Sequence, residues 1–418
     1  MRLLYLIALR LYGFAIRLVA FFNGKAALWV AGRRQWRRSH QAMQEARPSE
    51  GAPLVWVHCA SLGEFEQGRP VIEGLKQARP GVKVLLSFFS PSGYSLRKNY
   101  EQADYVVYLP LDTPANARSF LSIWKPALAV FVKYEFWYFH LKALHQAGVP
   151  TLLVSALFRP GQLFFRSWGG PFRQVPAWFK HIFVQNEASA ALLRTKGLDN
   201  FSVAGDTRID RVMQIAEQTP AFPLVEAFCE QAHVLIAGST WPGDEALLIP
   251  FLNHHLPEGW KAIIAPHQIR AAHIQTLSGQ LQGKACIYSE ADEAALRSAR
   301  VLLIDNVGML SALYQYGRLA YIGGGFGAGI HNTLEPIAFG LPVIFGPKYE
   351  KFEEARFLVS SGAGFSISQM AELHAAFDAL LPEAAYREAS EKARRYLAAN
   401  QGASRAAVAA ILAEMENS

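Results

Sequence analysis

Short apolar runs alternate with helical stretches along most of the chain. In the first half these runs cover residues 54–59, 82–89, 105–109, 127–132, 151–156, 181–184 and 201–204. The pattern pauses over residues 206–231 and then resumes at 234–237, 261–265, 285–288, 301–304, 319–322 and 342–345. Because the runs are continuously apolar and helical stretches such as 64–78 separate them, they predict parallel strands covered by helices on both faces.

The repetition of this pattern predicts two doubly wound, Rossmann-like α/β halves that face a cleft. We expect an N-terminal domain over residues 41–215 and a C-terminal domain over residues 216–390. Residues 391–418 are expected to form a C-terminal helix, and residues 1–40 stand apart from both halves.

The first residues of the chain have the character of a membrane-attached helix. Residues 3–22 are strongly apolar, but they include Arg10 and Arg17, which lie seven positions apart and so project from one helix face. A charge near the centre of a bilayer is costly, which favours a helix that lies in the membrane interface. A spanning helix with snorkelling arginines and a cleaved signal peptide are the alternatives.

The charge of the chain supports the same interpretation. The formal net charge is +7, yet residues 1–40 contain eight basic residues and no acidic ones, which leaves 33 basic and 34 acidic residues elsewhere. A basic protein often binds nucleic acid. Here the excess charge lies beside an apolar helix, which favours an anionic membrane surface as the partner and argues against nucleic acid. Residues 1–40 are therefore predicted to be a membrane anchor with a basic flank.

Charged residues follow three of the predicted strands in the first half. Glu64 follows the first strand in the opening turn of a helix, Glu135 follows the fourth strand, and Arg208 follows the last. Ligands bind at the carboxyl ends of strands in sheets of this kind, so each residue is a candidate for chemistry. Each also has an ordinary explanation: Glu64 complements a helix dipole, Glu135 begins a helix, and Arg208 pairs with Asp206 or Asp210.

Two glycine-rich turns in the second half are candidates for phosphate binding. The turn GSTWPGDE (238–245) offers backbone N–H groups at a helix start. The segment YIGGGFGAGIHNTLEP (321–336) contains a formal dinucleotide fingerprint, but it comes late in the chain and does not open a helix after a first strand. Instead Asn332 and Thr333 lead into a helix that carries Glu335, a suitable acceptor for ribose hydroxyls. We predict a nucleotide site here, with N-capping as the alternative role of Asn332 or Thr333.

Several motifs are absent from the sequence. It contains no Asp-x-Asp pair, no Walker A motif and no His or Cys cluster with metal-ligand spacing. We therefore predict no bound metal and no cofactor. Backbone dipoles and side chains such as Arg208, His267 or Lys348 would then stabilise the negative charge of a phosphate leaving group.

Four motifs follow one another along the chain: HCASLGE (58–64), EFW (135–137), APH (265–267) and HNTLE (331–335). With these motifs in this order, the sequence resembles the family of Kdo (3-deoxy-D-manno-octulosonic acid) transferases. The similarity extends over residues 54–347 and includes the N-terminal anchor. It implies an inverting, metal-independent glycosyltransferase of GT-B fold that moves Kdo from CMP-Kdo to a lipid A precursor (lipid IVA). It also implies a role in lipopolysaccharide biosynthesis at the cytoplasmic face of the inner membrane.

The resemblance also implies roles for individual residues. Glu64 would be the general base, and Glu135 and Arg208 would stabilise the transition state. Contacts with CMP are implied for Pro266, His267, Val307, Gly308, Met309, Asn332, Thr333, Leu334 and Glu335.

This sequence departs from the family pattern at several positions. Arg208 stands where lysine is usual, His267 where arginine is common, and Thr333 where proline is frequent. These changes affect the contacts that bind the donor more than they affect the reaction itself.

Two alternative functions fit the same sequence. One is another GT-B transferase that uses a UDP-sugar and a lipid acceptor, which CMP and UDP binding would distinguish. The other is a non-catalytic, lipid-binding protein of GT-B fold, which the presence of Glu64, Glu135 and the segment 332–335 disfavours.

Overall fold

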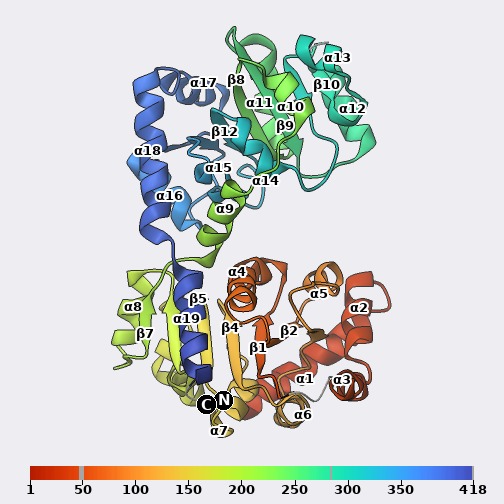
Figure 1. The fold of residues 1–418 in the computed structure, drawn as a ribbon, viewed down its shortest axis with the longest axis vertical. Coiled ribbons are helices and arrows are strands. Elements are labelled where there is room, and N and C mark those ends of the chain that lie inside the picture. Colours follow the sequence, from red (N-terminus) through yellow and green to blue (C-terminus); the bar gives the residue numbers. More distant parts are fainter. Residues whose placement is uncertain (47–50, 283–284, 417–418) are drawn as a thin grey trace. The chain divides into compact units, whose positions relative to one another are not determined.

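The protein is described here from a computed structural model, which covers residues 1–46, 51–282 and 285–416 (Figure 1). The chain forms two compact units. Unit 1 comprises residues 1–211 and the C-terminal residues from Asn400, and unit 2 comprises Val212–Ala399. Each unit contains one seven-stranded sheet whose strands all pair in parallel. The α/β class predicted from the apolar runs is therefore confirmed.

Every strand predicted in the first half is present in the sheet of unit 1. Its strands are β1 (Leu54–Cys59), β2 (Lys83–Phe88), β3 (Tyr105–Tyr108), β4 (Leu128–Val132), β5 (Thr151–Ala156), β6 (His181–Val184) and β7 (Phe201–Val203). They pair in the order β3-β2-β1-β4-β5-β6-β7. The strand order reverses between β1 and β4, which is the switch point beside which open α/β sheets bind ligands.

The helices of unit 1 cover both faces of this sheet. They are α1 (Arg2–Val19), α2 (Gly24–Arg33), α3 (Trp36–Glu45), α4 (Leu62–Ala78), α5 (Pro91–Arg97), α6 (Pro114–Trp124), α7 (Tyr138–Gln146), η1 (Leu163–Phe165), η2 (Ser167–Trp178), α8 (Glu187–Arg194) and α19 (Ala403–Glu416). Helix α9 (Thr207–Glu217) begins in unit 1 and continues into unit 2.

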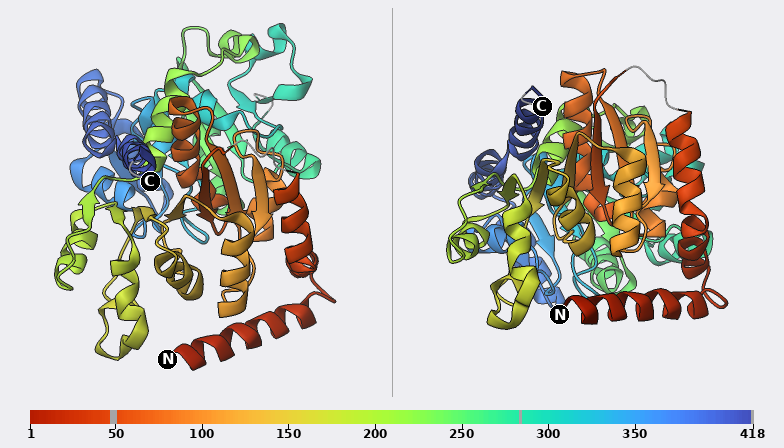
Figure 2. Two further views of the ribbon diagram at one scale, coloured as in Figure 1. Left: turned by 60° about the horizontal axis from the view of Figure 1, so that its bottom comes forward. Right: turned by 90° about the horizontal axis from the view of Figure 1, so that it is seen from below.

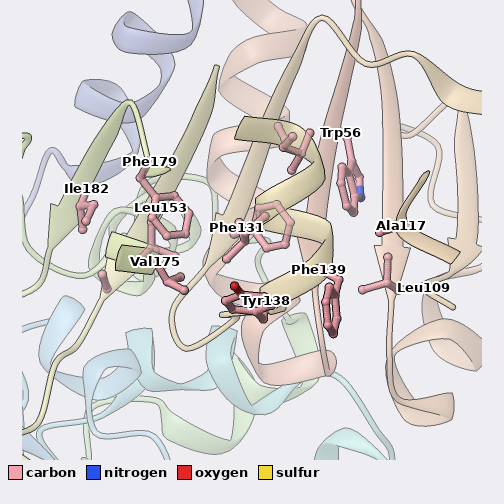
Figure 3. Close-up of a cluster of buried hydrophobic side chains, with 14 of the residues drawn as sticks. Trp56, Leu109, Ala117, Phe131, Tyr138, Phe139, Leu153, Val175, Phe179 and Ile182 are labelled. Atoms are coloured by element: carbon pink, nitrogen blue, oxygen red, sulfur yellow. The ribbon is translucent and has the colours of Figure 1, made fainter. Parts of the chain in front are cut away.

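The two faces of the sheet have separate hydrophobic cores. Val55 and Val57 of β1 join the core formed with α4 and α19. Trp56, which lies between them in sequence, joins the opposite core, where Phe131 of β4 and Tyr138 of α7 also lie (Figure 3). Because successive residues enter opposite cores, the strands are apolar at nearly every position.

The sheet of unit 2 repeats this design. Its strands are β8 (His233–Thr240), β9 (Trp260–Pro266), β10 (Ala285–Ile287), β11 (Val301–Leu303), β12 (Leu319–Ile322), β13 (Val343–Phe345) and β14 (Gly364–Ser366). They pair in the order β10-β11-β9-β8-β12-β13-β14, so the order reverses between β8 and β12. Strand β14 was not predicted, because only three residues form it and two of them are partly exposed.

Helices also surround this second sheet. They are α10 (Pro223–Cys229), α11 (Pro242–His254), α12 (Ala271–Gln280), η3 (Tyr288–Glu290), α13 (Glu293–Ser298), α14 (Leu310–Leu313), η4 (Tyr314–Tyr316), α15 (Leu334–Ala338), α16 (Glu353–Ser361), α17 (Met370–Ala379) and α18 (Glu383–Asn400). The segment 206–231, expected to be a pause between the halves, contains α9 and α10.

The C-terminal segment differs from the single helix expected over residues 391–418. Helices α18 and α19 are separated at Gly402, whose φ of +100° a non-glycine residue rarely adopts. The carboxylate of Asp210 accepts hydrogen bonds from the backbone N–H groups of Gly402 and Ser404 at 2.5 and 2.6 Å. This carboxylate holds the start of α19, which returns the chain to unit 1.

Helix α1 packs on unit 1 through one side only. The Tyr5 hydroxyl donates to the buried Asp112 at 2.8 Å, and the Tyr12 ring contacts Trp29 at 5.9 Å. The other side exposes the large apolar side chains of Leu3, Leu4, Ile7, Leu11, Phe14 and Leu18. Figure 2 shows α1 as one straight helix whose outer side no other element covers. Among the described residues, no helix combines the length and the apolar character needed to cross a membrane.

The buried His40 of α3 makes the stability of unit 1 sensitive to acid. Trp124 Nε1 donates to His40 Nδ1 at 3.2 Å, so this nitrogen must be unprotonated in the fold. Burial lowers the pKa of His40 from 6.5 to about 4. Because the unfolded chain then binds a proton at a higher pH than the folded one, stability is lost as the pH falls from about 6.5 to about 4. The expected loss in the free energy of unfolding is about 3 kcal/mol.

Urea unfolding measured across this pH range tests the prediction. The variant His40→Gln keeps an acceptor for Trp124 and removes the titrating ring, so its unfolding free energy should depend less on pH. His145→Gln, which changes an exposed histidine of the same unit, should retain the wild-type dependence. An equally steep dependence in His40→Gln would contradict the assignment.

Candidate active site

A buried hydrogen-bonded chain holds Glu135 at the end of β4. Lys133 takes a left-handed conformation (φ +65°), which turns the chain sharply after the strand. Glu135 is only 8% exposed. Its Oε2 atom lies 3.3 Å from Nε2 of His58 in β1 and accepts a hydrogen bond from the Trp137 indole. The carboxylate is therefore held from two sides.

His58 is itself held by residues of the neighbouring strand. Its Nδ1 atom lies 2.8 Å from Oγ of Ser87, the residue opposite it in the β1–β2 pairing. Trp56 Nε1 donates to the same Oγ at 2.7 Å. A neutral His58 that accepts from Ser87 at Nδ1 has its proton on Nε2 and donates it to Glu135. This assignment gives every group in the chain a partner.

Glu64 lies at the carboxyl end of β1, the strand that pairs with β4. It occupies the first turn of α4, where the Ser61 hydroxyl donates to its Oε2. The pKa of the buried Cys59 thiol is raised first by burial and then by the charges of Glu64 and Glu135. The two glutamates predicted from sequence therefore follow the two neighbouring strands between which the strand order reverses.

Arg208 lies at the start of α9 and pairs with Asp206, the ordinary explanation noted above. Its Nε donates to Asp206 Oδ2 at 2.8 Å, and its backbone N–H donates to Oδ1 at 2.9 Å. Burial would raise the pKa of Asp206, but the charge and hydrogen bonds of Arg208 outweigh it and lower the pKa. Gln67 of α4 donates to the same carboxylate at 3.0 Å, so the helix that carries Glu64 is tied to Arg208.

The predicted donor-binding residues of unit 2 gather in part around one pocket of about 360 Å³. Its lining residues are Gly238, Ser239, His267, Gly308, Leu310, Ser311, Tyr314, Ile322, His331, Asn332 and Glu335. His267, Gly308, Asn332 and Glu335 were predicted from sequence. The other predicted contacts do not line it: Pro266, Met309, Thr333 and Leu334 are buried, and Val307 is 89% exposed.

Both glycine-rich turns form the walls of this region because β8 and β12 are neighbours in the sheet. A Cβ atom on Gly323 would lie 2.2 Å from the carbonyl oxygen of Ser239, so only glycine fits there. Asp244 joins the two turns: it accepts from the backbone N–H groups of Trp241 and Gly324 at 2.9 and 2.8 Å. The sequence motifs 238–245 and 321–336 are therefore parts of one structure.

Three aromatic rings stack beside the pocket. The His267 ring stacks against both Trp241 and His331, with ring centroids 4.6 and 4.4 Å apart. Trp241 Nε1 donates to His331 Nε2 at 2.9 Å. Burial and then the neighbouring His267 lower the pKa of His331. His331 is therefore neutral at pH 7, with Nε2 as an acceptor.

Asn332 connects the turn to the helix that carries Glu335. Its Nδ2 donates to Glu335 Oε1 at 3.0 Å, and its Oδ1 accepts from the backbone N–H of Leu334 at 3.1 Å. Thr333 is the N-cap residue of α15 but makes no side-chain capping bond, so Asn332 satisfies the first N–H of the helix instead. Glu335 also lies near the buried hydroxyl of Tyr314, whose pKa is raised by burial and then by this carboxylate.

Comparison with known proteins supports one family. Residues 33–211 match the family model described as 3-deoxy-D-manno-octulosonic-acid transferase (kdotransferase). The chain is 28% identical to 3-deoxy-D-manno-octulosonic acid transferase of Aquifex aeolicus over 81% of this chain and 89% of that protein. It is 29% identical to the protein of the same name from Bordetella pertussis, over 86% of each chain.

The family model and these relatives support the Kdo transferase family for this chain. Solved structures show similarity of fold alone. A glycosyltransferase from Rickettsia africae is similar over 88% of this chain and 100% of its own, with 12% identity and a TM-score of 0.54. A UDP-GlcNAc 2-epimerase from Neisseria meningitidis is similar over 87% and 100%, with 16% identity and a TM-score of 0.58. These neighbours support the predicted GT-B-like arrangement of two α/β units.

Some residues at the candidate site were not predicted. His58 and Ser87 are polar residues inside otherwise apolar strands, and that pattern was visible in the sequence. Ser311 and Tyr314 lie on α14 and η4, which are too short to show a helical period.

Lys348 was a candidate for stabilising the negative charge of the leaving group. Its side chain donates a hydrogen bond to the carbonyl oxygen of Gly327 at 2.8 Å. In the described part of the chain, no group of three His, Cys, Asp or Glu side chains is placed to hold a metal ion.

Proposed function

We propose that this glycosyltransferase moves Kdo from CMP-Kdo to a lipid A precursor in lipopolysaccharide biosynthesis, without a metal ion. The observation that carries the proposal is the pocket of unit 2, where a glycine-rich turn, Asn332 and Glu335 meet in a chain similar to the Kdo transferase family. These features suit a nucleotide with a ribose and a single phosphate.

The donor is assigned to this pocket by the chemistry of its walls. Glu335 supplies a carboxylate for ribose hydroxyls, and Asn332 holds one of its oxygens in place. The backbone turn at Gly238 and Ser239, at the end of β8, lines the pocket beside the proposed position of the phosphate. His267 and Gly308 complete the wall, and we assign the neighbouring residues Pro266, Val307, Met309, Thr333 and Leu334 to shaping this site.

Replacement of Glu335 tests the donor site. A hydrogen bond to a charged group contributes about 1.5–3 kcal/mol, so Glu335→Ala should weaken CMP binding by roughly 10- to 100-fold. Isothermal titration with CMP measures this, and titration with UDP separates the proposal from a UDP-sugar enzyme. Glu293→Ala removes an exposed carboxylate of α13 outside the pocket and should leave CMP affinity unchanged. If Glu335→Ala binds CMP with wild-type affinity, Glu335 does not contact the ribose and has only a structural role.

The transfer step needs a base on the acceptor side. The lipid hydroxyl attacks the anomeric carbon of Kdo, the bond to CMP breaks, and the hydroxyl proton must be removed. Glu64 is our candidate for the base, since it lies in the first turn of α4 at the carboxyl end of β1, where ligands bind in sheets of this kind. Glu135 is held by His58 and Trp137, which suits a group that stabilises charge in a fixed geometry. Arg208 adds positive charge for the developing anion.

Glu64→Gln should separate catalysis from binding. It preserves the shape of the side chain and removes its basicity, so kcat should fall by about 10²- to 10⁴-fold with CMP affinity nearly intact. Glu64→Asp should retain a little activity. The control Glu66→Gln changes a carboxylate of the same helix that pairs with Arg97 and should turn over normally. If Glu64→Gln is as fast as wild type, the base lies elsewhere and Glu135 is next to be tested.

The membrane surface is the proposed location, at the cytoplasmic face of the inner membrane. The apolar side chains exposed on α1 lie opposite the side that packs on unit 1, which suits a helix lying in the interface. Removal of residues 1–40 would also remove the buried Trp29, Trp36 and His40. Single substitutions on the exposed face therefore test the anchor better than a deletion does.

Phe14→Glu should weaken attachment to anionic vesicles. Phe14 is 58% exposed on α1, and the loss of one buried aromatic contact with lipid, worth about 1.5–3 kcal/mol, should lower vesicle affinity by at least about tenfold. Val203→Glu changes a residue that is 48% exposed on β7 and should bind vesicles normally. Sedimentation with vesicles decides this, and equal binding by the two variants would refute the anchor.

A further inference from the structure

A second pocket, of about 310 Å³, lies among the N-terminal helices of unit 1. Its lining residues are Arg17, Trp29, Val30, Arg33, Arg34, Trp36, Pro110, Leu111 and Asn116. They come from α1, α2, α3 and the segment from β3 into α6. The proposed transfer reaction uses none of these residues.

The pocket is cationic and contains no acidic side chain. Arg17, Arg33 and Arg34 contribute three guanidinium groups, and residues 1–40 contain no Asp or Glu. Within the described residues, Arg17 and Arg34 form no ion pair or side-chain hydrogen bond, and both are exposed. Their donors are therefore available to an anion from outside the chain.

Arg33 gives the pocket a fixed cationic wall. Its guanidinium donates to the carbonyl oxygens of Leu109 at 2.9 Å and Phe89 at 2.7 Å. It also lies over the rings of Trp29 and Phe89, 4.1 and 4.6 Å from their centroids. Burial lowers the pKa of Arg33 to about 9. Its bonding partners are neutral, so an anion in the pocket would supply the counter-charge that the protein lacks.

The position of the pocket beside the apolar side of α1 indicates the kind of molecule to which the anion belongs. Arg17 lies one residue before Leu18 on α1, and Leu18, like Phe14 and Leu11, exposes its side chain to solvent. An anionic group in the pocket can therefore be joined to apolar chains that lie along the exposed side of α1. This combination of an arginine pocket and an apolar face is typical of sites for lipid headgroups.

We infer that the pocket formed by Arg17, Arg33 and Arg34 binds the phosphate monoester of a membrane lipid headgroup. A monoester presents more unesterified oxygens to the arginines than a diester does, and it carries more charge. The phosphate belongs either to a bulk phospholipid or to the glycolipid acceptor. The site would orient α1 on the membrane as well as attach it.

The test compares two variants with the same change in charge. Arg17→Gln/Arg34→Gln removes the two exposed arginines of the pocket and leaves the structural bonds of Arg33 intact. Lys25→Gln/Arg38→Gln removes two exposed cations of the same segment that do not line it. Each purified full-length protein is titrated with phosphatidylcholine vesicles that contain phosphatidic acid, a monoester, or phosphatidylglycerol, a diester, matched in surface charge.

The wild-type protein should bind the phosphatidic acid vesicles about tenfold more tightly, the effect of one additional charge-assisted hydrogen bond. The pocket variant should lose this preference, and the control variant should keep it. Because the two kinds of vesicle have the same surface charge, general electrostatic attraction cancels in the ratio of a protein's affinities for them. The vesicle assay needs no catalysis, so its outcome is independent of the proposed Kdo transfer.

A second measurement identifies an acceptor phosphate, and it rests on the proposed function. In neutral detergent, the pocket variant should raise the KM for a phosphorylated lipid acceptor about tenfold relative to the control variant if the acceptor is the source. If the pocket variant loses the preference for phosphatidic acid vesicles, the pocket binds bulk lipid. If the pocket variant has a raised KM for the phosphorylated acceptor, the pocket binds the acceptor. If the pocket and control variants behave alike in both assays, the inference is overturned.

Discussion

A parallel sheet buried on both faces has room for reactive side chains only where its strands end. This constraint governs both units, since residues along each strand alternate between two apolar cores. In unit 1 the ends of β1 and β4 lead to Glu64 and Glu135. In unit 2 the ends of β8 and β12 lead to the two glycine-rich turns. Each pair of strands flanks the reversal in strand order, so topology places the polar residues.

The exceptions to this rule support the catalytic assignment. His58 and Ser87 are buried polar residues within β1 and β2, and such groups destabilise a core unless they are fully hydrogen-bonded. Here they form a continuous chain from Trp56 to Glu135. The chain fixes the orientation of one carboxylate. Glu64, in contrast, is partly exposed and is bonded to the Ser61 hydroxyl in a helical turn, which leaves it better suited to exchange a proton.

The sequence predicts strands well where the apolar runs are long enough to cross a core. It fails at β14, where three residues lie at the edge of the sheet, and at α9 and α10, where two helices occupy the expected pause. Glycine-rich turns and charged residues at strand ends were visible as motifs. The stacking of His267 against Trp241 and His331 was not visible, because it depends on three loops that meet only in the folded sheet. The arginine pocket could not be predicted from the sequence for the same reason, although the excess of positive charge in residues 1–40 was evident.

The most direct test of the account is mass spectrometry of the lipid product formed by the purified protein from CMP-Kdo and a lipid A precursor. The account predicts an acceptor enlarged by Kdo, with CMP released in the same proportion and no requirement for added metal. It also predicts that Glu64→Gln forms this product far more slowly while still binding CMP. An unmodified acceptor in the presence of active, folded protein, or modification from a UDP-sugar in place of CMP-Kdo, would contradict it.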